Sequence, residues 1–292
     1  MIKFFLTGFA RLPLRVNHWL GAVLGWAMYV LSPRLRQRTR ENLARYFAYT
    51  GLSDKKAQTQ LLRQTISESG KGIAELAVVW LAPVTRLHGL VKTCSGWEHV
   101  AAAQKQGKGI IFVSPHLGCF DIAGRYLSSR LELVALYRPP KLKWLEPLMQ
   151  AGRARSGIAT APAGLRGVRQ LLKALREQGS TMILPDQVPA PEQGGEGVWA
   201  DLFGAPAYTM TLLPRLAEST GAATLFFFAG RLPHGAGYHV HIEPLPQPFA
   251  ADKALAARQT NVMVEKLVAM APAQYLWSYN RFKRPAGAPP LP

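Results

Sequence analysis

The stretch GIIFVSPHLGCFD, residues 109–121, decides how this chain folds and where its chemistry lies. Its apolar first half predicts a buried strand. Pro115 and Gly118 then predict a tight turn, because proline keeps the preceding residue extended and glycine permits a sharp backbone path. We therefore expect His116 in a strand-to-helix turn and Asp121 in the first turn of the helix that follows.

The spacing of His116 and Asp121 indicates a base held by an acid. Five residues of α-helix turn through about 500°, so the two side chains meet only if the chain bends between them. We expect the carboxylate to hold one imidazole nitrogen while the other faces substrate, which proton abstraction from a hydroxyl needs near neutral pH. Spacing alone leaves open a histidine that caps a loop. Its place beyond the carboxyl end of a strand, where open α/β sheets bind ligands, favours catalysis.

Composition and charge restrict the class of protein. The 292 residues suffice for one large α/β domain with an appendage or for two smaller domains, and 48% of them are hydrophobic. Cys94 and Cys119 lack the spacing of a disulfide framework or zinc site, and we expect Cys119 to be a small packing residue. The net charge of +18 predicts an anionic partner. Nucleic acid is disfavoured because no nucleic-acid-binding module is present, which leaves acidic headgroups, a phosphorylated substrate or an acidic carrier protein.

The N-terminus predicts membrane contact. Residues 16–31 are apolar and contain Trp19 and Trp26, but sixteen helical residues reach only about 24 Å of a hydrocarbon core of about 30 Å. They predict either a short anchor or an interfacial helix, and an ordinary core helix is the alternative. The cations that follow favour a cytoplasmic location for the rest of the chain; they are Arg34, Arg36, Arg38, Arg40 and Arg45. We therefore divide the chain into a membrane-associated segment, residues 1–45, and a catalytic domain, residues 46–292.

The remaining pattern alternates strands with helices and predicts an α/β fold with a mixed, largely parallel sheet covered on both faces. Further strands are expected at residues 133–137, 181–184, 223–229 and 238–243. Helices are expected at residues 53–81, 97–106, 121–129, 142–155, 165–176, 209–220 and 252–270. The Gly- and Pro-rich connection at residues 189–206 predicts a loop that covers an apolar ligand. The helix at 165–176 has an apolar stripe opposite four cations, which we expect to face solvent or headgroups.

Several kinds of chemistry lack support. No G-x-S-x-G elbow, P-loop or G-x-G-x-x-G motif after a strand is present. His239 and His241 share one strand face, but no third ligand is evident, so two half-exposed strand histidines are favoured over a metal site. We expect neither a metal nor another cofactor.

Taken together, five short motifs resemble one family in their order along the chain. They are SPHLGCFD at 114–121, YRP at 137–139, GRARS at 152–156, PDQ at 185–187 and APAQYLWSYNRFKRP at 271–285. The chain resembles, over almost its whole length, the late acyltransferases of lipid A biosynthesis within the lysophospholipid acyltransferase superfamily. The shared His-x4-Asp/Glu element falls on His116 and Asp121. Members of this subgroup often carry glutamate at the acid position. This chain has the shorter aspartate there, which puts in doubt any role that needs the longer side chain. The EGTR block of glycerolipid acyltransferases is missing.

The resemblance implies transfer of a fatty acyl chain from acyl carrier protein to a hydroxyl of a lipid A precursor, at the cytoplasmic face of the inner membrane and against anionic lipid. It implies direct transfer without an acyl-enzyme. Arg153 is the expected contact of the oxyanion or of a phosphate, with turn amides near Gly118 as the alternative oxyanion donors. The expected substrate-binding residues are Arg138, Arg155, Asp186 and Gln187. Another phospholipid or glycolipid acceptor is the alternative.

Overall fold

The computed structural model describes residues 2–137 and 146–291 and has the predicted α/β architecture. Its main sheet has seven strands in the described residues, in the order β1-β9-β8-β2-β5-β3-β4. The strands are β1 (Val91–Ser95), β2 (Ile110–Val113), β3 (Leu133–Tyr137), β4 (Ile158–Pro162), β5 (Ser180–Ile183), β8 (Ala223–Arg231) and β9 (Tyr238–Pro244). The pairs β1-β9, β8-β2, β2-β5, β5-β3 and β3-β4 are parallel, and among the described strands of this sheet only β8-β9 is antiparallel. The predicted mixed, largely parallel sheet is thus confirmed.

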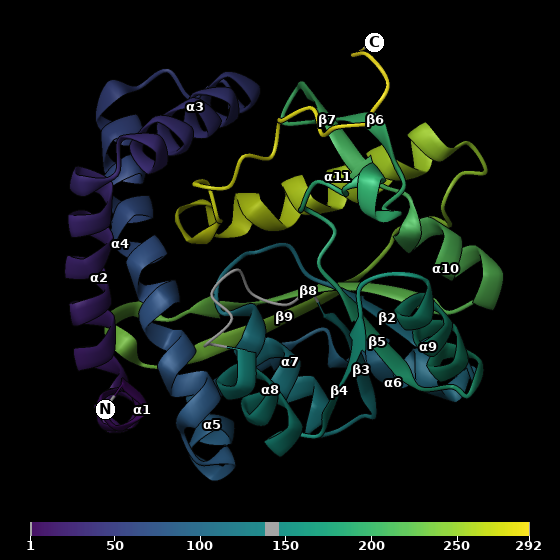
Figure 1. Cartoon of the computed structure of the whole chain (residues 1–292), viewed down its shortest axis with the longest axis horizontal. Coiled ribbons are helices and arrows are strands. Elements are labelled where there is room, and N and C mark those ends of the chain that lie inside the picture. The colour runs from purple at the N-terminus through teal and green to yellow at the C-terminus, as the bar shows by residue number, and fades with distance from the viewer. Residues whose placement is uncertain (1, 138–145, 292) are drawn as a thin grey trace.

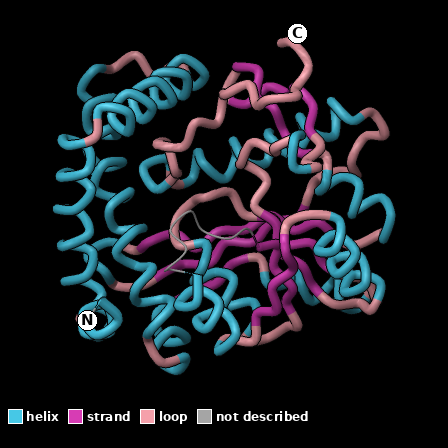
Figure 2. Tube along the Cα trace, viewed as in Figure 1, coloured by secondary structure: helices cyan, strands magenta, loops and turns pink. Residues whose placement is uncertain are grey.

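Helices cover both faces of this sheet, as Figures 1 and 2 show. Alternate residues of a strand point to opposite faces. Accordingly, Ile110 and Phe112 of β2 join one core and Ile111 and Val113 join the other. The first core is completed by helices α5 (Val84–Leu90), α6 (Trp97–Lys105), α7 (Phe120–Ser128) and α8 (Glu146–Arg155). The second is completed by helices α9 (Leu165–Arg176), α10 (Leu212–Thr220) and α11 (Lys253–Met270).

The first helices of the chain form a separate layer at one side of the sheet (Figure 1). They are α1 (Ile2–Arg11), α2 (Leu14–Leu31), α3 (Pro33–Thr50) and α4 (Lys55–Leu81). Glycines let α2 lie directly on α4, because a Cβ on Gly25 would come within 2.2 Å of the Ile66 carbonyl oxygen and one on Gly70 within 2.0 Å of the Gly21 carbonyl oxygen. The division proposed at residue 45 falls inside α3. In the described part of the chain, no helix is both long and apolar enough to cross a membrane.

The prediction that residues 189–206 form a loop over a ligand was wrong. Much of this segment forms an antiparallel hairpin of β6 (Gly197–Leu202) and β7 (Ala205–Met210), which packs on α11. Phe203 lies at its turn and is buried against Tyr46 and Trp277. Its apolar side chain therefore fills the core rather than covering a ligand. The short helical turns Pro191–Gln193, Pro233–Gly235 and Pro272–Gln274 complete the described elements.

Two further strands, both in the main sheet, were not predicted either. The short strand β1 pairs with β9 at one edge of the sheet, and β4 pairs with β3 at the other. Both show a mixed burial pattern rather than an apolar run, because an edge strand has only one neighbour. The expected start of α8 at residue 142 lies outside the described residues.

Candidate active site

The turn after β2 presents His116 as expected. Gly118 has a φ of 61°, and a Cβ there would lie 2.0 Å from the Ala229 carbonyl oxygen, so both conformation and space require glycine. Cys119 precedes the first residue of α7. The imidazole of His116 is 13% exposed.

The acid that holds His116 is Asp186, and not Asp121 as predicted. The Nδ1 atom of His116 lies 2.7 Å from Oδ1 of Asp186, and the backbone N–H of His116 donates to Oδ2 of the same carboxylate at 2.8 Å. Asp186 follows β5, the parallel neighbour of β2, so the carboxyl ends of two adjacent strands bring the pair together. Asp186 had been assigned to substrate binding. Asp186 and His116 both follow predicted strands of a parallel sheet, and this shared position at the carboxyl ends could have indicated that they meet.

The hydrogen bonds fix one tautomer of His116. A carboxylate only accepts, so Nδ1 carries the proton that Asp186 binds. The other nitrogen, Nε2, lies 3.0 Å from Nε2 of Gln187, whose amide donates to the imidazole lone pair. Burial raises the pKa of Asp186, but the charge and hydrogen bonds of His116 outweigh it and lower that pKa. The lone pair of a correctly oriented base is therefore on Nε2.

Asp121 belongs to a neighbouring arginine cluster. Its Oδ2 accepts a hydrogen bond from Nε1 of Trp80 at 3.2 Å, and its Oδ1 accepts one from Arg153 at 3.1 Å. The first turn of α7 thus directs this carboxylate toward α4 and α8 rather than toward the imidazole. Arg155 is exposed and donates to the carbonyl of Trp80. Arg153 also lies with its guanidinium carbon 5.7 Å from the ring centre of Tyr137.

Arg125 is a member of this cluster that was not predicted. It is 3% exposed and donates to the Gly152 carbonyl and the Ser156 hydroxyl, while its Nε and second Nη are buried without a hydrogen-bond partner in the described structure. Burial lowers its pKa to about 10; Asp121 raises this pKa and the nearby arginines lower it. Arg125 lies four residues after Asp121 on the predicted helix, and this spacing was the signal in the sequence that could have placed it near Asp121. Arg125, Arg153 and Arg155 thus gather around the single carboxylate of Asp121, so this cluster carries a net positive charge.

The N–H groups of Gly118 and Cys119 are already engaged in backbone hydrogen bonds. The N–H of Gly118 donates to the Gln274 carbonyl at 3.1 Å, and that of Cys119 donates to the Ala229 carbonyl at 2.9 Å. The carbonyl of Gly118 accepts from Arg231 at 3.0 Å. The turn is therefore held in place by its own backbone groups, and these two N–H groups are not free for an oxyanion.

The ion pair behind this turn is fully buried. Arg231 binds Glu75 through two hydrogen bonds of 2.8 Å, and Glu75 also accepts from Tyr238 and contacts His18 of α2. Burial raises the pKa of Glu75, but Arg231 and His18 lower it to about 2. The N-terminal layer, the sheet and the His116 turn are thereby joined by one network.

The C-terminal motif supports the turn from the other side. The N–H of Leu276 donates to the carbonyl of His116 at 3.0 Å. Arg281 is 3% exposed and donates to the carbonyl of Tyr208 and the hydroxyl of Thr209. The motif at residues 271–285 is therefore structural in this structure, since it positions the turn that carries the histidine.

The remaining candidate residues supply no further catalytic group among the described residues. Arg138 is outside the described residues. His239 and His241 each contact the Ser95 hydroxyl at 3.1 Å. Across residues 2–137 and 146–291, no group of three or more His, Cys, Asp or Glu side chains could hold a metal ion. Burial raises the pKa of the Cys119 thiol well above its ordinary value, so this thiol stays protonated.

An oriented histidine at the carboxyl edge of a parallel sheet is a feature of α/β enzymes that bind their ligands at this edge. The family model described as "Bacterial lipid A biosynthesis acyltransferase" matches residues 1–284. The chain belongs to this family and is an acyltransferase of lipid A biosynthesis.

Curated relatives agree with this assignment over nearly the whole chain. The chain is 28% identical to a lipid A biosynthesis lauroyltransferase of Escherichia coli (strain K12), covering 96% of this chain and 89% of the relative. It is 27% identical to a palmitoleoyltransferase of lipid A biosynthesis from the same organism, covering 95% and 88%. It is 25% identical to a lipid A biosynthesis acyltransferase of Haemophilus influenzae, covering 94% and 84%.

Proposed function

We propose that this enzyme transfers a fatty acyl chain from acyl carrier protein directly to a hydroxyl of a lipid A precursor. The observation that carries the proposal is the contact of 2.7 Å between His116 Nδ1 and Asp186, which leaves the lone pair of Nε2 for the acceptor hydroxyl. Membership of the family supports the lipid A precursor as acceptor. The relatives are named for two different acyl groups, so the donor's chain length stays outside the proposal.

The reaction follows from this tautomer. The acceptor hydroxyl displaces the Gln187 amide, and Nε2 of His116 removes the hydroxyl proton as the oxygen attacks the thioester carbonyl. The resulting imidazolium is stabilised by Asp186. The C–S bond then breaks, the acyl group stays on the acceptor oxygen, and the carrier thiol leaves with the proton from the imidazolium. General-base assistance of this kind contributes roughly 10² to 10⁴ in rate.

The arginine cluster supplies the positive charge that this reaction needs. Arg153 is held by Asp121 at 3.1 Å and is 15% exposed, so it is fixed and still accessible. We assign it to the oxyanion or to a phosphate of the acceptor, with Arg155 as a further phosphate contact. Asp121 thus acts in catalysis by positioning Arg153 and not by orienting the base.

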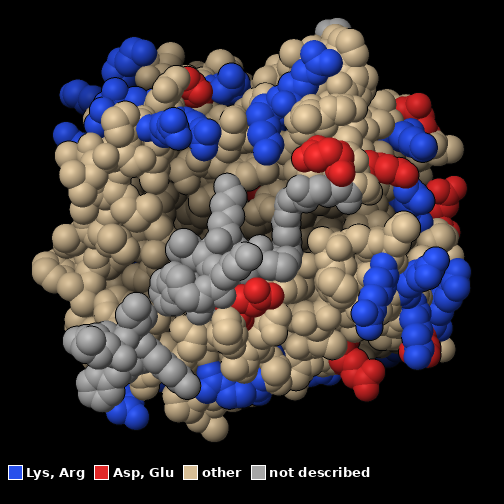
Figure 3. All heavy atoms as spheres, in the orientation of Figure 1, with Lys and Arg blue, Asp and Glu red and all other residues tan. Residues whose placement is uncertain are grey.

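The membrane partner is assigned to the outward face of α2. Val16, Trp19, Val23, Trp26 and Val30 follow one helical face and are 40–66% exposed. Figure 3 shows no charged side chain along this side, whereas cations gather above it over α3. An apolar stripe beside basic residues is typical of a helix that lies in the membrane interface. We therefore propose that α2 lies on anionic lipid of the inner membrane, on the cytoplasmic side.

The transfer proposal is tested with purified protein, an acyl carrier protein donor and a lipid A precursor in mixed micelles. Product is measured by mass spectrometry. The unchanged enzyme should acylate the precursor, and His116→Ala should reduce turnover by at least 10² while the far-ultraviolet circular dichroism shows that the variant is folded. Full turnover by the variant, or acylation only of a different phospholipid or glycolipid, would refute the proposal.

The membrane assignment has its own test. Trp19→Ser with Val23→Ser should reduce sedimentation with anionic vesicles. The matched control is Leu255→Ser on α11, a residue that is 59% exposed and lies outside the stripe. Equal binding of both variants would refute the assignment of α2.

A further inference from the structure

We propose that the outward face of helix α9 is the docking surface for the acidic carrier protein that delivers the acyl chain. This inference rests on the proposed function, because it names where the donor of that reaction binds. It concerns a surface separate from His116 and the arginine cluster.

The face is defined by four cations of one helix. Arg166, Arg169, Lys173 and Arg176 follow each other at spacings of three and four residues, so they share one side of α9, and all four are exposed. The opposite side is buried in the core through Gly167, Leu171 and Leu175. The four cations are therefore held on a rigid element rather than on a loop.

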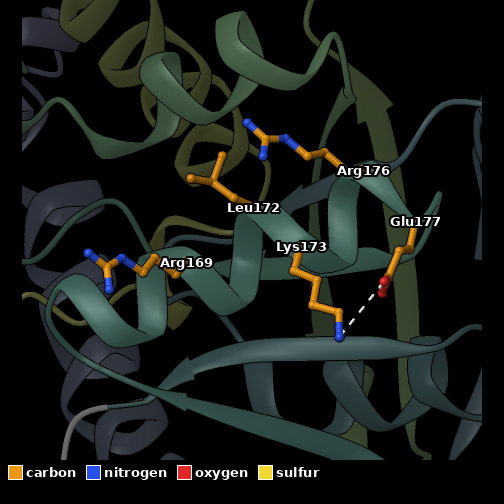
Figure 4. A pocket seen from close by; sticks show the side chains of 5 residues that line it. All are labelled: Arg169, Leu172, Lys173, Arg176 and Glu177. Atoms are coloured by element: carbon orange, nitrogen blue, oxygen red, sulfur yellow. Dashed lines mark ion pairs between the residues drawn. The ribbon is translucent and has the colours of Figure 1, made fainter.

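Ion pairing neutralises little of the positive charge of this face. Among the described residues, the one ion pair found for these four cations joins Lys173 to Glu177 at 3.9 Å, and the two side chains are 76% and 65% exposed. Such an exposed pair contributes little. Figure 4 shows the side chains fanning out from α9 around Leu172. A surface hollow of about 350 Å³ is lined by Arg169, Leu172, Lys173, Arg176 and Glu177. A partner with carboxylates around a small apolar contact would complement this surface.

The position of α9 suits delivery to the active site. The helix follows β4, and β4 runs parallel to β3, β5 and β2, so α9 begins at the carboxyl edge of the sheet where His116 and Asp186 lie. Twelve residues of helix extend about 18 Å from that edge. A carrier on this face therefore meets that edge at the first turn of α9, near Arg166, while Lys173 and Arg176 extend its contacts away from the edge.

The arrangement favours a protein partner over a membrane. In Figure 1 α2 and α9 lie at opposite ends of the longest axis, and in Figure 3 cations gather over the α9 end while the α2 side is uncharged. A bilayer in contact with the outward side of α2 does not reach α9. The cations of α9 are then left facing solvent, where a soluble acidic protein has access.

The test variant is Arg169→Gln/Lys173→Gln/Arg176→Gln, which removes three positive charges from α9. The control variant, Lys55→Gln/Lys56→Gln/Arg63→Gln, removes three positive charges from exposed positions on α4. Each enzyme is assayed with the acyl group on carrier protein and with the same acyl group on pantetheine alone. For the α9 variant, kcat/KM with the carrier donor should fall about tenfold at low salt, because steering by complementary charge accelerates association by 10- to 1,000-fold. Its rate with acyl pantetheine should equal that of the unchanged enzyme.

The outcomes separate the two proposals. If the unchanged enzyme transfers from carrier protein but the α9 variant keeps the same kcat/KM, the docking surface is refuted and the proposed function stands. The docking surface is also refuted if the α9 variant loses as much activity with acyl pantetheine as with the carrier donor, or if the α4 control loses as much kcat/KM as the α9 variant. It is refuted as well if the α9 variant no longer binds anionic vesicles. If the unchanged enzyme uses acyl pantetheine but not the carrier donor, the proposed donor itself is wrong.

Discussion

Replacing Asp186 by asparagine should disable the base without removing it. Asp186 faces two donors, the Nδ1–H and the backbone N–H of His116, at 2.7 and 2.8 Å. An asparagine has one carbonyl oxygen and one NH2 group, so one of the two donors then meets another donor. The backbone N–H cannot change, whereas the imidazole can move its proton to Nε2.

The magnitude follows from this change of tautomer. With the proton on Nε2, the lone pair faces position 186 and no longer faces the acceptor hydroxyl. The enzyme then loses general-base assistance, and kcat should fall by roughly 10² to 10⁴. The KM for the acceptor should change little, because the arginines that we assign to its phosphates are not in contact with Asp186.

The assay measures kcat and KM for Asp186→Asn beside Asp121→Asn as the matched control. Asp121 is also a buried aspartate, but its partners are Trp80 and Arg153 and not His116. We expect Asp121→Asn to disturb Arg153, and hence to weaken acceptor binding as well as turnover. If Asp186→Asn kept kcat within threefold while Asp121→Asn abolished it, our assignment of the base's partner would be wrong.

Three further predictions concern the surroundings of the turn. Glu75 has a folded pKa of about 2 against an ordinary value of 4.5, so it stabilises the fold above pH 4.5, and this contribution is lost as pH falls toward 2. At about 1.4 kcal/mol per pKa unit, Glu75→Gln should remove about 3 kcal/mol of the pH dependence of unfolding, measured with urea between pH 2 and pH 7. Cys119→Ala should keep most of the activity, because burial keeps the thiol protonated and a protonated thiol is a poor nucleophile. Arg231→Lys should lower kcat about tenfold, because a lysine cannot hold Glu75 through two bonds and also the Gly118 carbonyl.

Each of these has an outcome that contradicts it. An unchanged pH dependence in Glu75→Gln would show that this carboxylate is not stabilised by its partners. A stable acyl adduct on Cys119, detected by mass spectrometry, would overturn direct transfer. For Arg231→Lys, the far-ultraviolet circular dichroism and the acceptor KM serve as controls; normal turnover with a destabilised fold would make the arginine structural only.

The sequence predicted the fold class from local signals. Continuous apolar runs such as residues 110–113 are typical of strands buried on both faces, and the helical stripe of α9 was visible as a period of three to four residues. Edge strands and the β6-β7 hairpin gave no such run, since they contact the core on one side only. Glycine and proline were therefore read as a loop where the structure has a hairpin.

The sequence by itself determined that a histidine lies after the central strand, and that an acid, several arginines and a basic surface accompany it. The tertiary structure alone decided which acid contacts the histidine. Asp121 is nearer along the chain, but the first helical turn directs it to Arg153, whereas Asp186 is brought to the imidazole by the pairing of β2 with β5. Strand pairing joins residues that are 70 positions apart, and no local spacing encodes which strands become neighbours.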